Sequence, residues 1–170
     1  MGLIPMAAAA LALPEAPRLS TGPEFEVFFA SGADFDEIAA LSLQGFGAEA
    51  LSAATLRRRV LQGHGALFGL RGPDGIAAYL LLYLNRRTRR AYVNEVLVAP
   101  VWRGRRLSGW LLGAAEVLAR QAGMRTFSAH VRASNTASLR AKLRQGMAEV
   151  ERLEGWYPGG ETAIYLKQYL

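Results

Sequence analysis

The sequence predicts a single α/β domain built around a mixed sheet, and three observations support this fold class. Apolar segments of strand length alternate along the chain with segments whose apolar residues recur at helical spacing. Glycine and proline turn signals separate these segments. With 170 residues, 51% of them hydrophobic and 20% charged, the chain has a globular composition and enough length for one core.

The N-terminal half is predicted to form a strand, two helices and a hairpin. Aromatic residues between turn signals predict the strand at 25–29. A first helix is predicted from about Asp34, and Ser52 is the expected N-cap of a second one. The segments 66–70 and 76–84 are predicted to be strands, because a proline- and glycine-containing turn of hairpin type joins them.

The C-terminal half is predicted to contain a strand-helix-strand unit, then a helix and two strands. The strand at 91–99 leads through a basic turn to a helix from about Leu107, for which Gly123 is a natural C-cap. Gly146 ends a short helix at 136–145. The remaining strands are predicted at 125–131, 147–156 and 162–169.

Residues 1–22 are predicted to be a flexible extension, and residues 23–170 the folded domain. The extension is apolar and rich in alanine, but no Lys or Arg precedes its apolar run, which argues against a signal peptide. The run is too short to span a bilayer, so no membrane association is expected. Because cysteine is absent, a reducing compartment is allowed, and we expect a cytoplasmic protein.

The formal net charge is +6 and comes mostly from arginine, whose planar guanidinium pairs well with phosphates and carboxylates. Seven arginines but one acid, Glu95, lie between Arg86 and Arg106, so an anionic partner is expected. No nucleic-acid-binding motif accompanies these arginines, and nucleic acid is therefore not the expected partner. No metal site is predicted, because cysteine is absent and histidine lacks metal-ligand spacing.

The segment that follows the strand at 91–99 has the composition of a phosphate-binding turn. It runs Arg103-Gly104-Arg105-Arg106-Leu107-Ser108-Gly109 and opens a helix. The first backbone N–H groups of a helix lack internal partners, and the helix dipole adds partial positive charge there. The segment therefore predicts a polyanionic cofactor, with an ordinary basic helix entry as the alternative interpretation.

From about Phe25 to its C-terminus, the chain resembles the GCN5-related N-acetyltransferase (GNAT) superfamily. The run Val98-Ala99-Pro100-Val101-Trp102-Arg103-Gly104-Arg105-Arg106-Leu107-Ser108 is similar to the acetyl-CoA signature of that family. Three later segments resemble ribosomal-protein alanine N-acetyltransferases: Val131-Arg132-Ala133-Ser134-Asn135, Gln145-Gly146-Met147 and Gly155-Trp156-Tyr157-Pro158.

The resemblance implies a mixed, mostly antiparallel sheet flanked by helices, with a splayed central strand pair. Acetyl-CoA would lie where the strand ending at Val98 diverges from the strand ending at Val131. The implied activity is direct transfer of an acetyl group from acetyl-CoA to a primary amine, either a protein N-terminus or a small molecule. No metal is implied, and the protein is expected to be a monomer or a homodimer.

The resemblance also implies which residues hold the cofactor. Backbone groups of 97–99 would pair with the pantetheine arm, and N–H groups of 104–109 would hold the pyrophosphate. Asn135 is expected to cap the following helix and to contact pantetheine or substrate. The predicted cofactor-binding residues are Leu97, Val98, Ala99, Arg103, Gly104, Arg105, Arg106, Leu107, Ser108, Gly109 and Asn135.

Four positions depart from the family pattern, and at one of them, Ser108, the change from the family's small residue is mild. Arg106 replaces a glycine, so its side chain either points away from the turn or acts as a phosphate ligand. His130 replaces a glutamate; it is either the base that deprotonates the amine or an ordinary strand residue. Lys142 replaces a tyrosine; it either protonates the departing thiolate or is a solvated lysine.

Glu95 is the remaining catalytic candidate, as an alternative base or as a partner of an arginine. On a regular strand it would share a face with Val93 and Leu97. Trp156 and Tyr157 either wall the acceptor pocket or belong to the core. Because both catalytic positions of the family are changed, an acyl-CoA-binding module without turnover is the alternative function.

Overall fold

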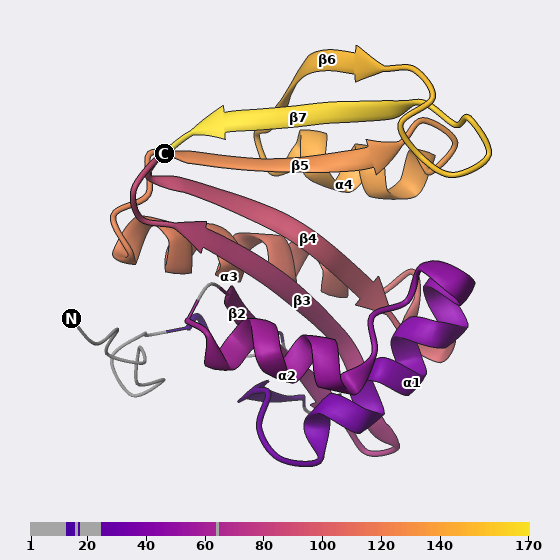
Figure 1. The fold of residues 1–170 in the computed structure, drawn as a ribbon. Coiled ribbons are helices and arrows are strands. Elements are labelled where there is room, and N and C mark those ends of the chain that lie inside the picture. The colour runs from indigo at the N-terminus through magenta and orange to yellow at the C-terminus, as the bar shows by residue number, and fades with distance from the viewer. Residues whose placement is uncertain (1–12, 16, 18–24, 64) are drawn as a thin grey trace.

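The computed structural model describes residues 13–15, 17, 25–63 and 65–170 (Figure 1). Within these residues the chain forms one seven-stranded sheet in the order β1-β2-β3-β4-β5-β7-β6. The predicted extension 1–22 lies mostly outside the described residues. Of its described part, Leu13 packs against the core, and the Glu15 carbonyl accepts a hydrogen bond of 2.9 Å from Trp110 Nε1.

The N-terminal half forms the predicted strand, two helices and hairpin. Its elements are β1 (Glu26–Phe29), α1 (Asp34–Phe46), the 3-10 turn η2 (Gly47–Glu49), α2 (Ala53–Leu61), β2 (Gly65–Gly72) and β3 (Gly75–Asn85). The Ser52 hydroxyl accepts a hydrogen bond of 3.2 Å from the Thr55 N–H, which confirms the predicted cap of α2.

The C-terminal half also follows the predicted order. Its elements are β4 (Arg90–Val98), the 3-10 turn η3 (Pro100–Trp102), α3 (Leu107–Gln121), β5 (Thr126–Arg132), α4 (Thr136–Arg144), β6 (Ala148–Leu153) and β7 (Ala163–Tyr169). The sequence did not indicate the two 3-10 turns, because three residues are too few to give a periodic pattern. The strand predicted at 147–156 ends earlier, at Leu153.

The sheet is mixed and mostly antiparallel, as predicted. Only β4 and β5 pair in parallel, and they do so from Arg90↔Thr126 to Val93↔Ala129. Beyond that point β4 continues to Val98 and β5 to Arg132 without pairing with each other. We call the point where this pairing stops the fork.

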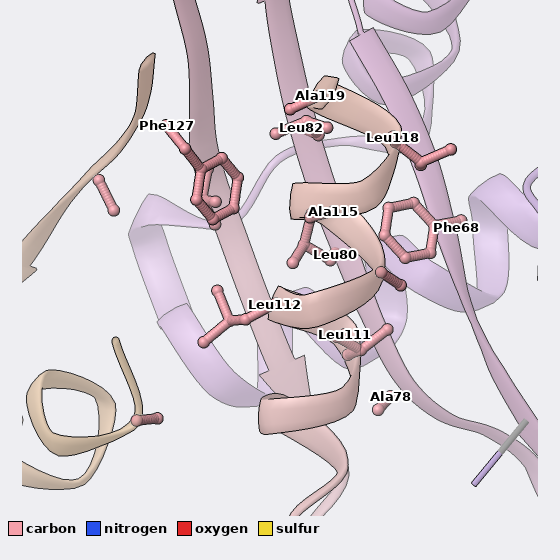
Figure 2. Packing of buried hydrophobic residues seen from close by; sticks show 14 of the residues in the cluster. Phe68, Ala78, Leu80, Leu82, Leu111, Leu112, Ala115, Leu118, Ala119 and Phe127 are labelled. Atoms are coloured by element: carbon pink, nitrogen blue, oxygen red, sulfur yellow. The ribbon is translucent and has the colours of Figure 1, made fainter. Parts of the chain in front are cut away.

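Helices cover both faces of the sheet. α3 lies on one face, here called the back, and packs its small and branched side chains on the central strands (Figures 1 and 2). α1 and α2 lie on the other face, here called the front, and enclose a second core cluster. Figure 2 shows Leu111, Leu112, Ala115, Leu118 and Ala119 of α3 facing Phe68, Leu80, Leu82 and Phe127.

Strand β3 is buried on both faces, which explains its nearly continuous apolar sequence. Leu80 and Leu82 join the back cluster, whereas Tyr79 and Leu81 join the front cluster. Successive side chains of a strand point to opposite faces, so both faces of β3 require apolar residues. In the part of the chain that the structure describes, no helix combines the length and apolar character needed to cross a membrane.

Leu80→Ala is expected to reduce the free energy of unfolding by about 2–5 kcal/mol, because it leaves a cavity under α3. Chemical denaturation measures this change. Leu61→Ala is the matched control, since Leu61 is 73% exposed and its loss should change stability by less than about 0.5 kcal/mol. Equal losses in the two variants would contradict the packing described above.

Candidate active site

The fork places the unpaired halves of β4 and β5 on either side of a gap in the sheet. A bulge in β4 decides which side chains face the front there. β3 pairs Leu82 with Val93 but Leu81 with Glu95, so the register shifts by one residue at Asn94. Val93 therefore faces the back, while Glu95 faces the front. The expectation that Val93 and Glu95 share a face was wrong, because it assumed a regular strand.

Glu95 lies half-buried beside the front cluster. The hydroxyl of the fully buried Tyr79 donates a hydrogen bond of 3.1 Å to Glu95 Oε2. Burial raises the pKa of Glu95, although this hydrogen bond opposes the effect. Among the described residues Glu95 forms no ion pair within contact distance, but the nearby Arg59 charge also acts to lower the pKa of Glu95, so the interpretation as an arginine partner stays open beside that as a base. A carboxylate with a raised pKa is suited to accept a proton near neutral pH.

His130 lies immediately past the fork, on the front face of β5. Its Nδ1 is 3.1 Å from the Tyr92 hydroxyl, and its ring stacks between Trp156 and Tyr165 at centroid distances of 5.0 and 4.8 Å. Burial lowers the pKa of His130, so the ring is neutral near pH 7 and able to accept a proton. Trp156 is 56% exposed and walls the site instead of joining the core.

A pocket of about 440 Å³ opens beside His130 on the front face. Tyrosine rings form much of its wall. Its lining residues are Tyr83, Asn85, Thr88, Arg90, Tyr92, Ser128, His130, Glu151, Leu153 and Tyr165. We call it the aromatic pocket. It has the size of a small-ligand site.

Lys142 lies on the opposite side of β5. α4 packs on α3 and β5, and the neighbouring Ala141 belongs to the back cluster. Lys142 is only 3% exposed, and its Nζ donates a hydrogen bond of 2.8 Å to Ser138 Oγ. The interpretation as a solvated lysine was therefore wrong. Burial lowers the pKa of Lys142 to about 8, so near neutral pH the side chain is an ammonium that gives up its proton readily.

The turn before α3 explains why a glycine is expected where Arg106 lies. Arg106 is the N-cap of α3 and has φ 61° and ψ 17°, the left-handed conformation that glycine adopts without strain. Any other residue there costs on the order of 1–2 kcal/mol. Arg106 nevertheless lines a second pocket, of about 350 Å³, between α3 and α4. The other lining residues are Ser108, Gly109, Ala141, Arg144 and Gln145.

The N–H groups of residues 104–108 donate to no acceptor within the described residues, as at the start of any helix, so they are free to bind a ligand. Gly109 differs from the prediction, because its N–H donates to the Arg106 carbonyl at 3.0 Å. Of the three arginines, Arg105 stacks over the Trp102 ring and Arg103 Nε donates to the Val98 carbonyl. Arg106 alone of these lines the second pocket.

Arg144 lies at the end of α4 and lines the same pocket, where it adds a positive charge to that of Arg106. The sequence analysis missed it. No local pattern distinguishes Arg144 from a solvated helix residue, because only the packing of α4 against α3 brings it to the turn.

The free backbone edge of β4 differs in part from the prediction for 97–99. The Ala99 N–H donates to the Ala77 carbonyl at 2.9 Å, so Ala99 points toward β3. Leu97 lies two residues earlier, opposite Tyr79, and by the alternation of an antiparallel ladder it also points toward β3. Val98 and Val96 instead direct their backbone groups into the gap.

Asn135 caps α4, as predicted, because its side-chain oxygen accepts a hydrogen bond of 3.1 Å from the Ser138 N–H. Near it, an ion-pair cluster that the sequence did not indicate crosses the open end of the fork. Arg132 binds Glu161 at 2.8 Å and also binds Glu49, which comes from the connection between α1 and α2. The Arg132 guanidinium lies 4.0 Å from the Tyr157 ring centroid. The cluster therefore connects loops from both halves of the split sheet.

Solved structures of similar fold include acetyltransferases. The ribosomal-protein-S18-alanine N-acetyltransferase from Escherichia coli has a TM-score of 0.74 at 22% identity, with 85% of this chain and 93% of that chain covered. A protein from Salmonella typhimurium that is assigned as an acetyltransferase and was solved with its cofactor acetyl-CoA has a TM-score of 0.71 at 18% identity, with 86% and 94% covered. A chain of the NatC complex, solved with a Gag peptide and CoA, has a TM-score of 0.74 at 16% identity, with 86% and 98% covered.

The split sheet, the helix entry behind it and the pocket in front of it define an α/β domain of the acyltransferase type. The model of the acetyltransferase (GNAT) family matches residues 35–147. The chain belongs to this family. Comparison with curated proteins gave no match. Within the described residues, no three metal-ligating side chains gather into one group.

Lys142→Met is expected to stabilise the protein at pH 7 by an amount on the order of 3 kcal/mol, because it removes a buried charge. The pKa of Lys142 is lower in the folded than in the unfolded state, so the unfolded state binds more protons between about pH 8 and 10.5. The stability of the wild type should therefore rise with pH across this window, and the advantage of the variant should shrink. Chemical denaturation of the wild type and of Lys142→Met at several pH values measures this difference in stability.

The control for that experiment is Lys167→Met, because the Lys167 side chain is only partly buried and its Nζ lies 4.5 Å from the Tyr169 ring centroid. Lys167→Met should change the stability at pH 7 much less than Lys142→Met does. If the difference between wild type and Lys142→Met did not vary with pH across the window, Lys142 would not be buried as described.

Proposed function

We propose that the protein is an N-acetyltransferase that moves an acetyl group directly from acetyl-CoA to a primary amine. The acceptor is a peptide N-terminus or a small amine. The observation that carries this proposal is the placement of Glu95 and His130 beside the fork. Glu95 and His130 face the front and Lys142 lies on the back, so an acceptor and a donor approaching from opposite faces would each meet a suitable group.

The chain has groups that fit CoA. Free N–H groups at 104–108 and the side chains of Arg106 and Arg144 suit a diphosphate. The backbone of Val96 and the N–H of Val98 offer hydrogen bonds to a pantetheine arm, which would lie beside β4 as an added strand does, whereas the Val98 carbonyl already accepts one from Arg103. Acetyl-CoA supplies an activated acetyl group as a thioester.

The side chains divide the proton transfers of the reaction between them. An alkylammonium must lose a proton before its nitrogen can attack, and His130 or Glu95 accepts that proton on the front face. The C–N bond then forms as the C–S bond breaks, and Lys142 gives a proton to the departing sulfur from the back. The nitrogen loses its second proton to solvent, and solvent in turn reprotonates Lys142, so one proton is released for each amide formed. A backbone N–H of β4 beyond the bulge at Asn94 polarises the thioester carbonyl of acetyl-CoA.

Replacement of the base is expected to reduce kcat by about 10²–10⁴-fold. His130→Ala and Glu95→Gln should be compared in steady-state assays across a panel of amines, with CoA affinity measured in parallel. The residue that acts as base is the one whose loss lowers kcat while CoA binding is unchanged. Because burial lowers the pKa of His130 below 6.5, a histidine base predicts an acidic limb below that pH in the wild type. Absence of turnover with every amine at saturating acetyl-CoA would contradict the proposal.

Arg106→Gly tests two roles of Arg106 by two measurements: stability reports the backbone strain, and CoA affinity reports the contribution of the side chain to cofactor binding. The glycine relieves the left-handed strain and should raise stability by about 1 kcal/mol, while the lost guanidinium should weaken CoA binding about tenfold. Calorimetric titration with CoA measures the affinity, and Arg105→Ala is the control, since Arg105 stacks on Trp102. Unchanged affinity in Arg106→Gly would show that its side chain points away from the phosphates.

The alternative function is an acyl-CoA-binding module without turnover. The strained Arg106 and the altered residues His130 and Lys142 favour it. Tight CoA binding without acetyl transfer to any amine would support this alternative, and a large loss of kcat in His130→Ala would exclude it.

A further inference from the structure

The composition of the aromatic pocket goes beyond what proton transfer requires. Tyr83 and Tyr92 stack at 6.5 Å with an interplanar angle of 18°, and Tyr92 in turn contacts His130. Tyr165 continues the aromatic surface on the far side of His130. Flat aromatic walls of this kind favour a flat or aromatic group of the ligand.

The end of the pocket away from the fork is cationic. Arg90 lies there, opposite Asn85 across the β3–β4 pair, and is exposed. It forms no ion pair with any residue that the structure describes. Arg90 precedes Tyr92 by two residues on one strand, so the two side chains lie on the same face about 7 Å apart.

An extended peptide has the same spacing as β4. Side chains of its first and third residues point to the same side and are also about 7 Å apart. A peptide whose N-terminal amine lies at His130 would therefore place its first side chain on the tyrosine rings and its third side chain near Arg90. The volume of about 440 Å³ suits a segment of this length.

We propose, on the basis of the function above, that the aromatic pocket selects peptide acceptors with an aromatic first residue and an acidic third residue. The ring lies against Tyr83 and Tyr92, and the carboxylate pairs with the Arg90 guanidinium. Tyr83 and Arg90 are thus specificity determinants that take no part in proton transfer.

Four tripeptide amides test this selection: Phe-Ala-Glu, Phe-Ala-Gln, Ala-Ala-Glu and Ala-Ala-Gln. The value of kcat/KM should be about tenfold higher for Phe than for Ala in the first position, because the ring gains stacking and apolar contact. It should be about threefold higher for Glu than for Gln in the third position, since the ion pair is partly exposed. Values within twofold of each other for all four peptides would overturn the proposal.

Three variants, one of them a control, test which residue is responsible for the preference for Phe in the first position and for Glu in the third. Tyr83→Leu should remove most of the preference for Phe and keep that for Glu, whereas Arg90→Gln should do the reverse. Arg86→Gln is the matched control, because Arg86 lies exposed in the turn between β3 and β4 and does not line the pocket. Preferences that persist in Tyr83→Leu and Arg90→Gln, or that are lost equally in Arg86→Gln, would overturn the assignment.

Peptide binding distinguishes the failure of this inference from the failure of the proposed function. Calorimetry with the CoA-loaded protein should rank the four peptides in the same order as kcat/KM. If no peptide or amine is acetylated but this order of binding is found, the proposed peptide selection is supported and the proposed acetyltransferase activity is contradicted. If neither turnover nor selective binding occurs, both proposals are contradicted.

Discussion

The short parallel pairing of β4 and β5 is the constraint on which the rest of the structure depends. The two strands share hydrogen bonds only from Arg90↔Thr126 to Val93↔Ala129, and both continue past that point. Their separation leaves backbone groups of β4 without a strand partner beyond the fork. α3, which connects the two strands, begins beside the open end of the fork, so its free N–H groups lie next to it.

The fork allows one sheet to keep two chemical environments apart. On the front face the bulge at Asn94 turns Glu95 toward Tyr79, and His130 projects from β5 among aromatic rings. On the back face Lys142 is a buried residue of α4. Burial acts in the same physical way on all three groups, since it raises the pKa of the acid and lowers the pKa values of the two bases.

The features that suit the site to chemistry also destabilise it locally. Arg106 adopts a left-handed backbone conformation, and Lys142 is a buried ammonium with one side-chain hydrogen-bond partner. The packing of α3 on β3 and the contacts of Arg132 across the open end of the fork offset these costs. The site thus occupies the least regular part of a sheet whose remainder is closely packed.

The sequence alone determined the order of strands and helices, the caps at Ser52 and Asn135, and the basic turn before α3. These features depend on side-chain periodicity and on turn chemistry within a few residues, which a single segment contains. Tertiary structure alone decided the bulge that turns Glu95 to the front and the burial of Lys142. It also decided that Arg144 lies at the turn before α3 and that Glu49 lies at the open end of the fork. Those outcomes depend on strand register and helix packing between segments far apart in the chain, and no local pattern encodes either.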